Sequence, residues 1–519
     1  MAFLDDLIGV FSPRAKYRRL YFKESQKSLS LASEVRDTHL RKYDGAARGR
    51  RTASWKANST SANAEIRTDI ITLRNRAREL VRNNPYAKRA KKAIGSNTVG
   101  TGIRPKITAA DIRQAEDLQK LWQAWSKSTK VDFDCRCNFY KIQKQVIEAM
   151  AESGEVLIRK RIRTDDGAVL PLRLQVLESD FIATPMFSSG GANGNRIVQG
   201  IEFDSDGCVV AYHLYENHPG DFNLPINGKG TFSTNRVPAE EIIHLYDPDR
   251  PGQIRGVTWF HAAMIRMRDF DDYEDAQLMR QKIAACFSVF VRDAQELDDP
   301  LSETDRTALG EKVEPGMIEY LPPGKDITLA NPPTVENYGE YQRAILHAIA
   351  SGIGVSYEAM TSDYSDVNFS SARMAKLEFE KNLSDWRELL LNPIFNDRVF
   401  EWFVESAALM GLRSSMATAT WIAPRRDMVD PTKEVPAKIK AIRAGIESLE
   451  DVVMQTGKDP IVHFEQVKET NKLLDSLGLV FDSDPRKTAD DGDLHPTETN
   501  NEQRSLNGSG LSNGEVRAN

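Results

Sequence analysis

Apolar residues recur at helical spacing in the first well-patterned part of the chain. Between Ile66 and Ile94 they lie on one face, and Asn84-Pro85 interrupts the pattern. We therefore predict two helices that are separated at this point, with arginines on the opposite face. Residues 109 to 130 and 138 to 152 show the same period and predict two more helices.

The period changes between residues 155 and 250. Short alternating or apolar runs, separated by Gly, Asp and Pro, replace the helical spacing. This region is therefore predicted to be rich in β-strands.

A long helix is predicted from Thr258 to Ala285, with a length of roughly 40 Å. Its apolar residues form a narrow seam, and its other faces are dense in charges of both signs. Such a helix is suited to packing side by side with copies of itself.

A compact insert follows this helix. It contains a predicted strand at Phe287 to Val291, an acidic linker, and a predicted hairpin that turns at Pro322, Pro323 and Gly324. A second long helix is then expected from Glu336 to Gly352.

A polar loop and an interrupted helix come next. The loop, Val355 to Ser370, contains no Lys or Arg. The helical pattern resumes at Ser371, is predicted to break at Asn392-Pro393, and continues to Met410.

The C-terminal part is predicted to be a small helical unit, residues 433 to 480, followed by a polar, disordered tail after Phe481. Because helical and β-rich stretches are segregated along the chain, we assign the fold to the α+β class.

The composition is that of a globular protein. The chain has 519 residues, 40% of them hydrophobic and 28% charged, which suits two to four domains and excludes wholesale disorder. No apolar run has the length of a membrane span, and four cysteines cannot form a disulfide framework. The start lacks the features of a secretory signal, so a cytoplasmic setting is expected.

Charge is distributed unevenly along the chain. Residues 1 to 106 contain 24 lysines and arginines against 9 acidic residues, whereas the remainder is acidic. Basic arms commonly bind nucleic acid or acidic partners, and Arg48, Arg50 and Arg51 are typical of this one. A solvated leader without a ligand is an equally good interpretation of the charge alone.

The sequence carries no motif that supports catalysis. We find no complete phosphate loop, nucleophile elbow or zinc-protease motif. Two acidic groups, Asp247-x-Asp249 and Asp269 to Asp275, could in principle hold metal ions for phosphodiester cleavage, but a turn and a solvated helix face explain them better. His213 and His218 do not have a spacing that predicts a joint metal site. We therefore predict no enzyme activity, metal or cofactor.

Several stretches occur in a specific order between about residues 60 and 480. They are RARELVRNNPYAKRAKKAIGSNTVGTGIRPKI (Arg76 to Ile107), SGEVLIRKR (Ser153 to Arg161), LQVLESDFI (Leu174 to Ile182), IVQGIEFDSDGCVVAYHLYENHPGD, VPAEEIIHLYDPDRPGQIRGVTWF (Val237 to Phe260), NFSSARMAKLEFEK and WIAPRRDMVDPTKE. In this combination the chain resembles the lambda-type bacteriophage portal proteins.

The resemblance implies a homo-oligomeric ring, usually of twelve subunits, at one vertex of the icosahedral procapsid. Double-stranded DNA passes through the ring during packaging and ejection. The implied partners are the terminase, which docks on the outside, the head-completion or connector proteins that replace it, and the major capsid and scaffold proteins. The protein would be found in the virion, and in the host cytoplasm during assembly.

The resemblance also implies the regions of a portal protein, and the sequence patterns suggest a residue range for each. They are a basic flexible arm (1–60), a wing (61–255 and 371–424), a first stem helix (256–286), a clip (287–333), a second stem helix (334–354), a tunnel loop (355–370), a crown (425–481) and a disordered tail (482–519).

Two of these regions are expected to carry function. The tunnel loop should approach DNA, and its acids without cations suit contact without tight binding. The clip should dock the terminase. The tunnel-loop residues are Ser362, Asp363, Tyr364, Ser365, Asp366, Val367 and Asn368, and the clip residues are Asp293, Glu296, Asp298, Asp299, Pro322, Pro323, Gly324 and Lys325.

Two alternatives remain open. The chain could be a minor capsid or scaffold-type protein that binds DNA through its basic arm. A metal-dependent nuclease that uses the acidic groups above is the less favoured alternative.

Overall fold

The chain folds as two units, Met1–Ser61 and Ala62–Asn519, which we describe separately. The structure, a computed structural model, describes residues 13–40, 50, 54, 59–164, 167–189, 194–221, 233–285, 289–293, 325–329, 337–365, 367–412, 416–425, 428, 430–479, 481 and 486.

The first unit contains one long helix, α2 (Pro13–Leu40). The sequence analysis expects a flexible arm here, so this regular helix differs from that expectation. After Pro13, which suits a first helical turn, the segment has no Pro or Gly and is rich in Lys, Arg, Leu and Ala. Tyr17 and Tyr21 are 75% and 70% exposed, so local propensity rather than a buried core accounts for the helix.

The second unit begins with four helices at the predicted positions. The predicted break between the first two is confirmed, because the Asn84 side chain accepts a hydrogen bond from the backbone of Ala87 and Pro85 lies in the next first turn. The helices are α3 (Ala62–Asn83), α4 (Pro85–Val99), α5 (Ile112–Lys127) and α6 (Phe139–Ser153).

The predicted β-rich region forms two antiparallel sheets. The three-stranded sheet has the order β3-β2-β9, and the five-stranded sheet has the order β4-β5-β6-β7-β8. Short 3-10 turns, η2 (Thr129–Val131), η3 (Ser179–Phe181) and η4 (Ala239–Glu241), lie beside the strands. The strands are β2 (Glu155–Ile162), β3 (Leu172–Glu178), β4 (Ser188–Ser189), β5 (Arg196–Val198), β6 (Ile201–Phe203), β7 (Val209–Tyr215), β8 (Thr234–Pro238) and β9 (Ile242–Tyr246).

A further antiparallel pair joins distant parts of the chain. Strand β1 (Arg104–Thr108) pairs with β12 (Thr418–Ile422). The helical segment before β12 is thereby fastened to the N-terminal helices.

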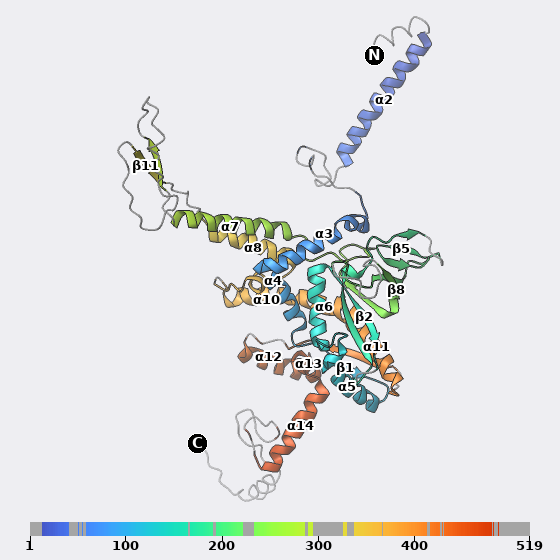
Figure 1. The fold of residues 1–519 in the computed structure, drawn as a ribbon, viewed down its shortest axis with the longest axis vertical. Coiled ribbons are helices and arrows are strands. Elements are labelled where there is room, and N and C mark those ends of the chain that lie inside the picture. The colour runs from blue at the N-terminus through green and yellow to red at the C-terminus, as the bar shows by residue number, and fades with distance from the viewer. Residues whose placement is uncertain are drawn as a thin grey trace, which may run out of the picture. The chain divides into compact units, whose positions relative to one another are not determined.

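Two long helices lie side by side, α7 (Met264–Ala285) and α8 (Tyr338–Ile353) (Figure 1). Helix α7 begins at Met264 rather than at the predicted Thr258. The intervening residues form turns, in which the Thr258 hydroxyl accepts a hydrogen bond from the backbone N–H of Phe260 at 3.2 Å. Along the chain, β10 (Val289–Asp293) and β11 (Lys325–Leu329) lie between the two helices and pair with each other.

The helical segment after the loop is continuous, so the predicted break at Asn392-Pro393 is wrong. Helix α10 (Phe369–Asp385) passes through a π-helical segment, η6 (Trp386–Asn396), into α11 (Asp397–Leu409). Proline lacks an N–H and clashes with the carbonyl four residues earlier in an α-helix, and the wider π turn accommodates it.

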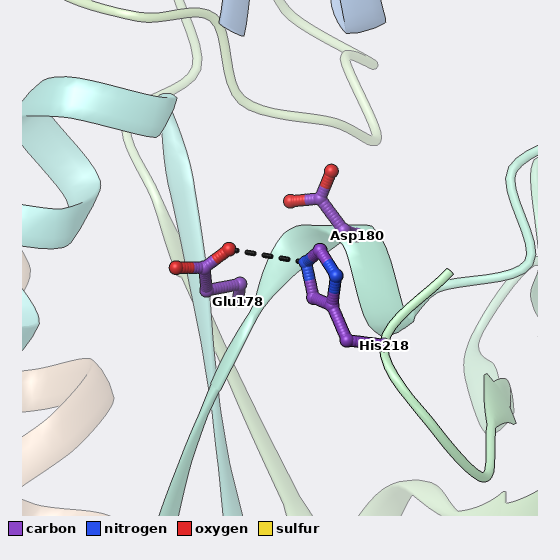
Figure 2. A group of neighbouring side chains, drawn as sticks. All are labelled: Glu178, Asp180 and His218. Carbon is purple, nitrogen blue, oxygen red and sulfur yellow. Dashed lines mark ion pairs between the residues drawn. The ribbon is translucent and has the colours of Figure 1, made fainter. Parts of the chain in front are cut away.

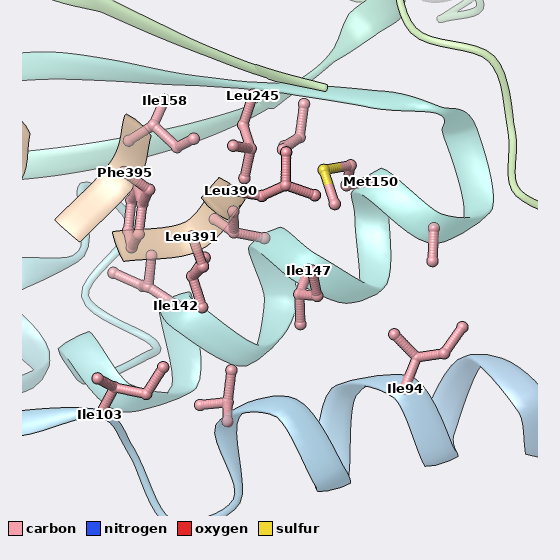
Figure 3. Close-up of a cluster of buried hydrophobic side chains, with 14 of the residues drawn as sticks. Ile94, Ile103, Ile142, Ile147, Met150, Ile158, Leu245, Leu390, Leu391 and Phe395 are labelled. Atoms are coloured by element: carbon pink, nitrogen blue, oxygen red, sulfur yellow. The ribbon is translucent and has the colours of Figure 1, made fainter. Parts of the chain in front are cut away.

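The hydrophobic core centres on α6. Figure 3 shows Ile147 of α6 between Ile94 of α4 and the strand residues Ile158 and Leu245, with Phe395 of η6 at the same side of the sheet. All five side chains are buried. The core therefore unites α4, α6, η6 and the three-stranded sheet.

The predicted C-terminal helical unit is confirmed as α12 (Pro431–Arg443), α13 (Leu449–Gln455) and α14 (Pro460–Leu477). The predicted disordered tail lies outside the described residues, apart from Arg486. Across the described part of the chain, no helix is both long and apolar enough to cross a bilayer. Cys135, Cys137 and Cys208 are free thiols, and Cys286 is not among the described residues.

Candidate functional site

The predicted tunnel loop, Val355 to Ser370, is not a loop throughout, because Tyr357–Thr361 form the short helix α9 and α10 already begins at Phe369. Residues 362 to 368 connect the two helices. Helix α9 is followed by Ser362, which has a left-handed backbone with a φ of 60°. Asn368 and Ser371 form a reciprocal capping box that begins α10. Both ends of the loop are therefore set by local hydrogen bonds, and Asp366 is the one loop residue outside the described set.

Asp363 faces its own chain. Its Oδ1 accepts hydrogen bonds from the Ser365 hydroxyl at 2.6 Å and the Ser365 backbone at 3.0 Å, and its Oδ2 accepts one from the Tyr357 hydroxyl at 3.0 Å. The Ser365 and Tyr357 hydrogen bonds lower the pKa of Asp363 to about 2. This carboxylate therefore shapes the loop, a role that the sequence analysis did not assign to it.

A cation from α8 also contacts the loop. The Arg343 guanidinium donates a hydrogen bond to the Ser365 hydroxyl at 3.1 Å and lies 3.9 Å from the Asp363 carboxylate. The absence of Lys and Arg from the loop sequence thus does not leave the loop without a positive neighbour.

A groove of about 480 Å³ lies beside the loop, between α4 and α10. Tyr364, 63% exposed, stands at the groove, and α9 contributes Glu358. Sequence reasoning missed this groove, although the spacing of cations along α4 and along α10 was visible. Its lining includes Arg89, Lys92, Ala93, Ser96 and Asn97 of α4, Ala359 of α9, and Ala372, Arg373, Ala375, Lys376 and Phe379 of α10.

Of the predicted clip residues, Asp293 and Lys325 are the two that the structure describes. They are opposite each other at the ends of β10 and β11. Strand β11 thus pairs with β10, whereas the segment expected as its hairpin partner, and the turn at Pro322 to Gly324, lie outside the described residues. So do Glu296, Asp298 and Asp299.

The basic arm is described at one of its three named positions. Arg50 is exposed, and Arg48 and Arg51 lie outside the described residues.

A histidine and two carboxylates meet near the end of β3. Glu178, Asp180 and His218 form the sole group of three metal-binding side chains among the described residues, with ligand atoms within 4.8 Å of one another (Figure 2). The Nε2 atom of His218 lies 3.2 Å from Oε2 of Glu178. His213, which lies five residues before His218 in the sequence, instead lies 3.2 Å from Glu202.

Two arginines of α3 already engage these carboxylates. Arg78 lies 2.6 Å from Asp180 and 3.0 Å from Glu178, and Arg74 lies 3.2 Å from Asp180. Burial raises the pKa of Asp180, but the charge of Arg74 and the Arg78 hydrogen bond outweigh it and lower that pKa. Because the guanidiniums contact the oxygens that a metal would need, we assign the group to fastening α3 to β3.

The two acidic groups considered for nuclease chemistry are Asp247-x-Asp249 and Asp269 to Asp275. Asp271 accepts a hydrogen bond from Asn84 at 2.7 Å, and Glu274 accepts one from Gln342 at 3.1 Å, so both join α7 to neighbouring helices. Burial and the nearby charge of Asp249 raise the pKa of Asp247. Neither acidic group supplies three clustered ligands within the described ranges.

Comparison with known proteins decides the family. The sequence profile described as "Phage portal protein, lambda family" matches residues 48–387. This chain belongs to the lambda family of phage portal proteins. The resemblance predicted from the sequence is confirmed, and the mixture of helices with antiparallel sheets agrees with the predicted α+β class.

The similarity of this portal-family chain to known relatives extends over most of its length. The probable portal protein of Halomonas phage phiHAP-1 is 29% identical over 467 residues, which cover 85% of this chain and 88% of that protein. Portal protein B of Escherichia phage lambda is 23% identical over 489 residues, with 83% and 90% covered. Among solved structures, the neck of an empty gene transfer agent particle shares 17% identity at a TM-score of 0.45, covering 76% of this chain and 94% of that one.

Proposed function

We propose that this chain forms a closed ring at one vertex of a phage capsid, through which double-stranded DNA passes during packaging and ejection. The family match over residues 48–387 is the observation that carries this proposal. Twelve subunits is the number expected from the resemblance to portal proteins. The role is structural and non-catalytic, with the energy for packaging supplied by a partner motor.

The helix pair α7 and α8 supports the proposed stem of the ring. Met267 and Phe270 of α7 are buried within the chain, whereas Ile265, Leu278 and Met279 are 71%, 50% and 58% exposed. Apolar side chains exposed along a long helix favour contact with another chain. We assign that contact to the adjacent subunits.

The remaining regions follow from this assignment. The wing comprises residues 61–255 and 371–424, the clip residues 287–333, the tunnel loop residues 355–370, and the crown residues 425–481. Helices α12 to α14 supply the crown, and the β10–β11 pair supplies the described part of the clip.

We further propose that the clip docks the terminase and afterwards the head-completion proteins. Deleting residues 293 to 325 should abolish binding of the terminase large subunit while leaving ring formation intact. Retained terminase binding by the deletion variant would remove this assignment. Capsid and scaffold proteins are the proposed partners at the vertex, with assembly in the host cytoplasm before the virion is complete.

The ring itself is tested by negative-stain imaging and native mass determination of the purified chain. The expected result is annular particles with a central opening that admits a duplex and a mass near twelve chains. Monomers or compact dimers that persist across salt and protein concentrations would contradict the proposal.

A further inference from the structure

Helix α7 has an acidic pocket along the edge that it shares with α3. The pocket has a volume of about 320 Å³. Among the described residues that line it, Arg268 is the one cation, whereas α3 and α7 together supply five carboxylates. These carboxylates belong to Glu79 of α3 and to Asp271, Asp272, Glu274 and Asp275 of α7. We call this side of α7 its acidic edge.

Contacts within the chain leave much of this negative charge uncompensated. The hydrogen bonds to Asp271 and Glu274 come from neutral amides, which do not cancel a charge. Asp272 lies 3.6 Å from Arg268, but the two side chains are 64% and 66% exposed, and such pairs are weak. Asp275 has no ion-pair or hydrogen-bond partner among the described residues. Burial and the charges of Asp275 and Asp272 raise the pKa of Asp271, so the acidic residues repel one another.

The other side of α7 carries two arginines, Arg266 and Arg280. At about 100° per residue they lie roughly 130° to 170° around the helix from the centre of the acidic edge. Neither has an ion-pair or hydrogen-bond partner among the described residues. Tyr273, which lies between them along the helix, packs on Tyr338 with ring centroids 5.9 Å apart, so this side faces toward α8. Asp269 is the one acidic residue that α7 places there, and we call this side the basic edge.

Exposed apolar side chains lie between the two edges. Ile265 and Met279 are 71% and 58% exposed, and Asp272 is seven residues from each, so the three share one face of the helix. A surface for the DNA backbone would be basic throughout. An apolar stripe with an acidic border on one side and a basic border on the other instead suits contact with another protein.

We propose that the acidic edge of α7 in one subunit packs against the basic edge of α7 in the adjacent subunit. A ring closes through heterologous contacts, in which one side of a subunit meets a different side of the next, so the two sides must be complementary. The two edges of α7 meet this requirement. They also overlap in height, because the acidic residues lie between Arg266 and Arg280 along the helix.

The inference rests on the proposed function, because it requires a ring, and it deepens that function by naming the surfaces that join the subunits. The charges would set the register of neighbouring stem helices and disfavour contact between identical edges. The apolar stripe would supply the buried area beside them.

Reversing the acidic edge of the full-length protein is the first part of the test. The variant Asp272→Arg/Asp275→Arg spares the two acids that accept hydrogen bonds within the chain. The matched control, Glu116→Arg/Asp117→Arg, reverses two exposed acids of α5 with the same change in net charge. Native mass determination over a series of protein concentrations measures the fraction of rings. The acidic-edge variant should need a concentration at least about tenfold higher for half-assembly, because arginines would then face arginines. The control should assemble like the unsubstituted protein.

Reversing the basic edge, alone and in combination, is the second part. Arg266→Glu/Arg280→Glu should impair ring formation by a similar factor, because acids would then face acids. The protein that carries all four substitutions exchanges the signs of both edges and should form rings again. This restoration separates loss of the contact from loss of folding, since the combined protein contains every substitution.

Four results would overturn the assignment. They are unimpaired rings in the acidic-edge variant, an equal loss in the α5 control, unimpaired rings in the basic-edge variant, and no restoration by the combined substitutions. Loss of rings on reversal of the acidic edge alone would assign that edge to a cation elsewhere on the adjacent subunit. Each of these results rejects the pairing of the edges, whereas failure of the unsubstituted protein to form rings rejects the proposed function itself.

Discussion

Arg255 and Glu155 form an ion pair in which neither side chain is exposed to solvent. The Arg255 Nε atom lies 2.9 Å from Oε2 of Glu155, and its Nη2 atom lies 2.5 Å from Oε1. The same carboxylate accepts a hydrogen bond from the backbone N–H of Gly256 at 3.0 Å and contacts His244 Nε2 at 3.0 Å. One carboxylate of β2 therefore joins β9 to the segment that leads into α7.

Replacing Glu155 with Gln should strongly destabilise the fold. The substitution leaves the buried guanidinium of Arg255 without a counter-charge, and breaking a buried pair on one side costs about 3 to 5 kcal/mol. Chemical denaturation of the purified variant measures this loss. Glu405→Gln is the control, because Glu405 pairs with Lys160 at the surface with 58% of its side chain exposed, and such pairs contribute about 1 kcal/mol or less. Equal losses in both variants would contradict a special role for the buried pair.

The contribution of Glu155 should also depend on pH in a defined direction. Burial raises its pKa, but the charge of Arg255 and the hydrogen bonds from His244 and Arg255 outweigh burial and hold that pKa far below its ordinary value. A depressed folded pKa means that the ionised group stabilises the fold above its unfolded pKa of about 4.3, and that this contribution declines as the pH falls below it. The difference in unfolding free energy between wild type and Glu155→Gln should therefore shrink below about pH 4. A difference that grows on acidification would contradict the ion pair.

Two glycines with similar backbones allow a matched test of packing. Gly154 has a φ of 88°, and a Cβ atom there would lie 2.4 Å from the carbonyl carbon of Val257. Gly252 has a φ of 81°, with no atom within 4 Å of its Cβ position. Gly252→Ala should cost about 1 to 2 kcal/mol for its left-handed backbone. Gly154→Ala should cost about 1 to 3 kcal/mol more, because backbone atoms must also move.

Thermal unfolding of both glycine variants separates the cost of the left-handed backbone from the cost of the steric clash at Gly154. Equal changes in the midpoint would mean that backbone strain alone acts at Gly154, and that its close approach to the segment before α7 contributes nothing.

Local signals account for the parts of the fold that the sequence could predict. The break at Asn84-Pro85 is visible in the sequence because a capping side chain and a first-turn proline act within a few residues. The same reasoning fails at Pro393, where distant packing decides the outcome. Trp386 of η6 packs on Trp259 with ring centroids 4.7 Å apart, and such long-range contacts favour a continuous helix over the expected break.

In the candidate site, too, local features could be predicted from the sequence, whereas contacts between distant segments could not. The loop could be located from its polar composition. Its hydrogen bond from the Ser365 backbone to Asp363 is also a local signal, because an aspartate commonly accepts a hydrogen bond from the backbone two residues later in a turn. The groove could not be predicted, because the fold must bring Arg89 and Arg373 together from distant parts of the chain. Nor does the polar composition of the loop reveal that Arg343 of α8 contacts it.

Arg387 should be essential for joining η6 to the end of α4. Its buried guanidinium donates to the backbone oxygen of Thr98 at 2.6 Å and also to that of Asn97. Arg387→Ala removes donors from carbonyl groups at the end of α4, at a cost of about 3 kcal/mol. Lys381→Ala on α10 is the control, since Lys381 is 69% exposed and pairs with Glu378, and its cost should stay within about 0.5 kcal/mol. Similar denaturation midpoints for the two variants would contradict this role of Arg387.

The two roles proposed for the loop, shape and proximity to DNA, can be separated at Asp363. Asp363→Ala removes the acceptor for Ser365 and Tyr357 without adding a cation. Amide hydrogen exchange in residues 362 to 368 should then become faster, while exchange in the α6 core stays unchanged. Tyr357→Phe removes only the hydroxyl donor and should produce a smaller increase in the same residues.

Replacing the loop acids with lysine adds positive charge, which the alanine variant does not. Replacing both Asp363 and Asp366 with Lys should slow DNA packaging in a reconstituted assay with intact rings, because each new cation near a phosphate backbone adds salt-dependent affinity. Asp363→Ala serves as its control, since it also removes the acceptor for Ser365 and Tyr357 but adds no positive charge. Slowing by the lysine pair alone supports an electrostatic contact between loop and DNA. Slowing by both variants attributes the effect to loop shape, and unchanged packaging by the lysine pair contradicts a loop that approaches the duplex.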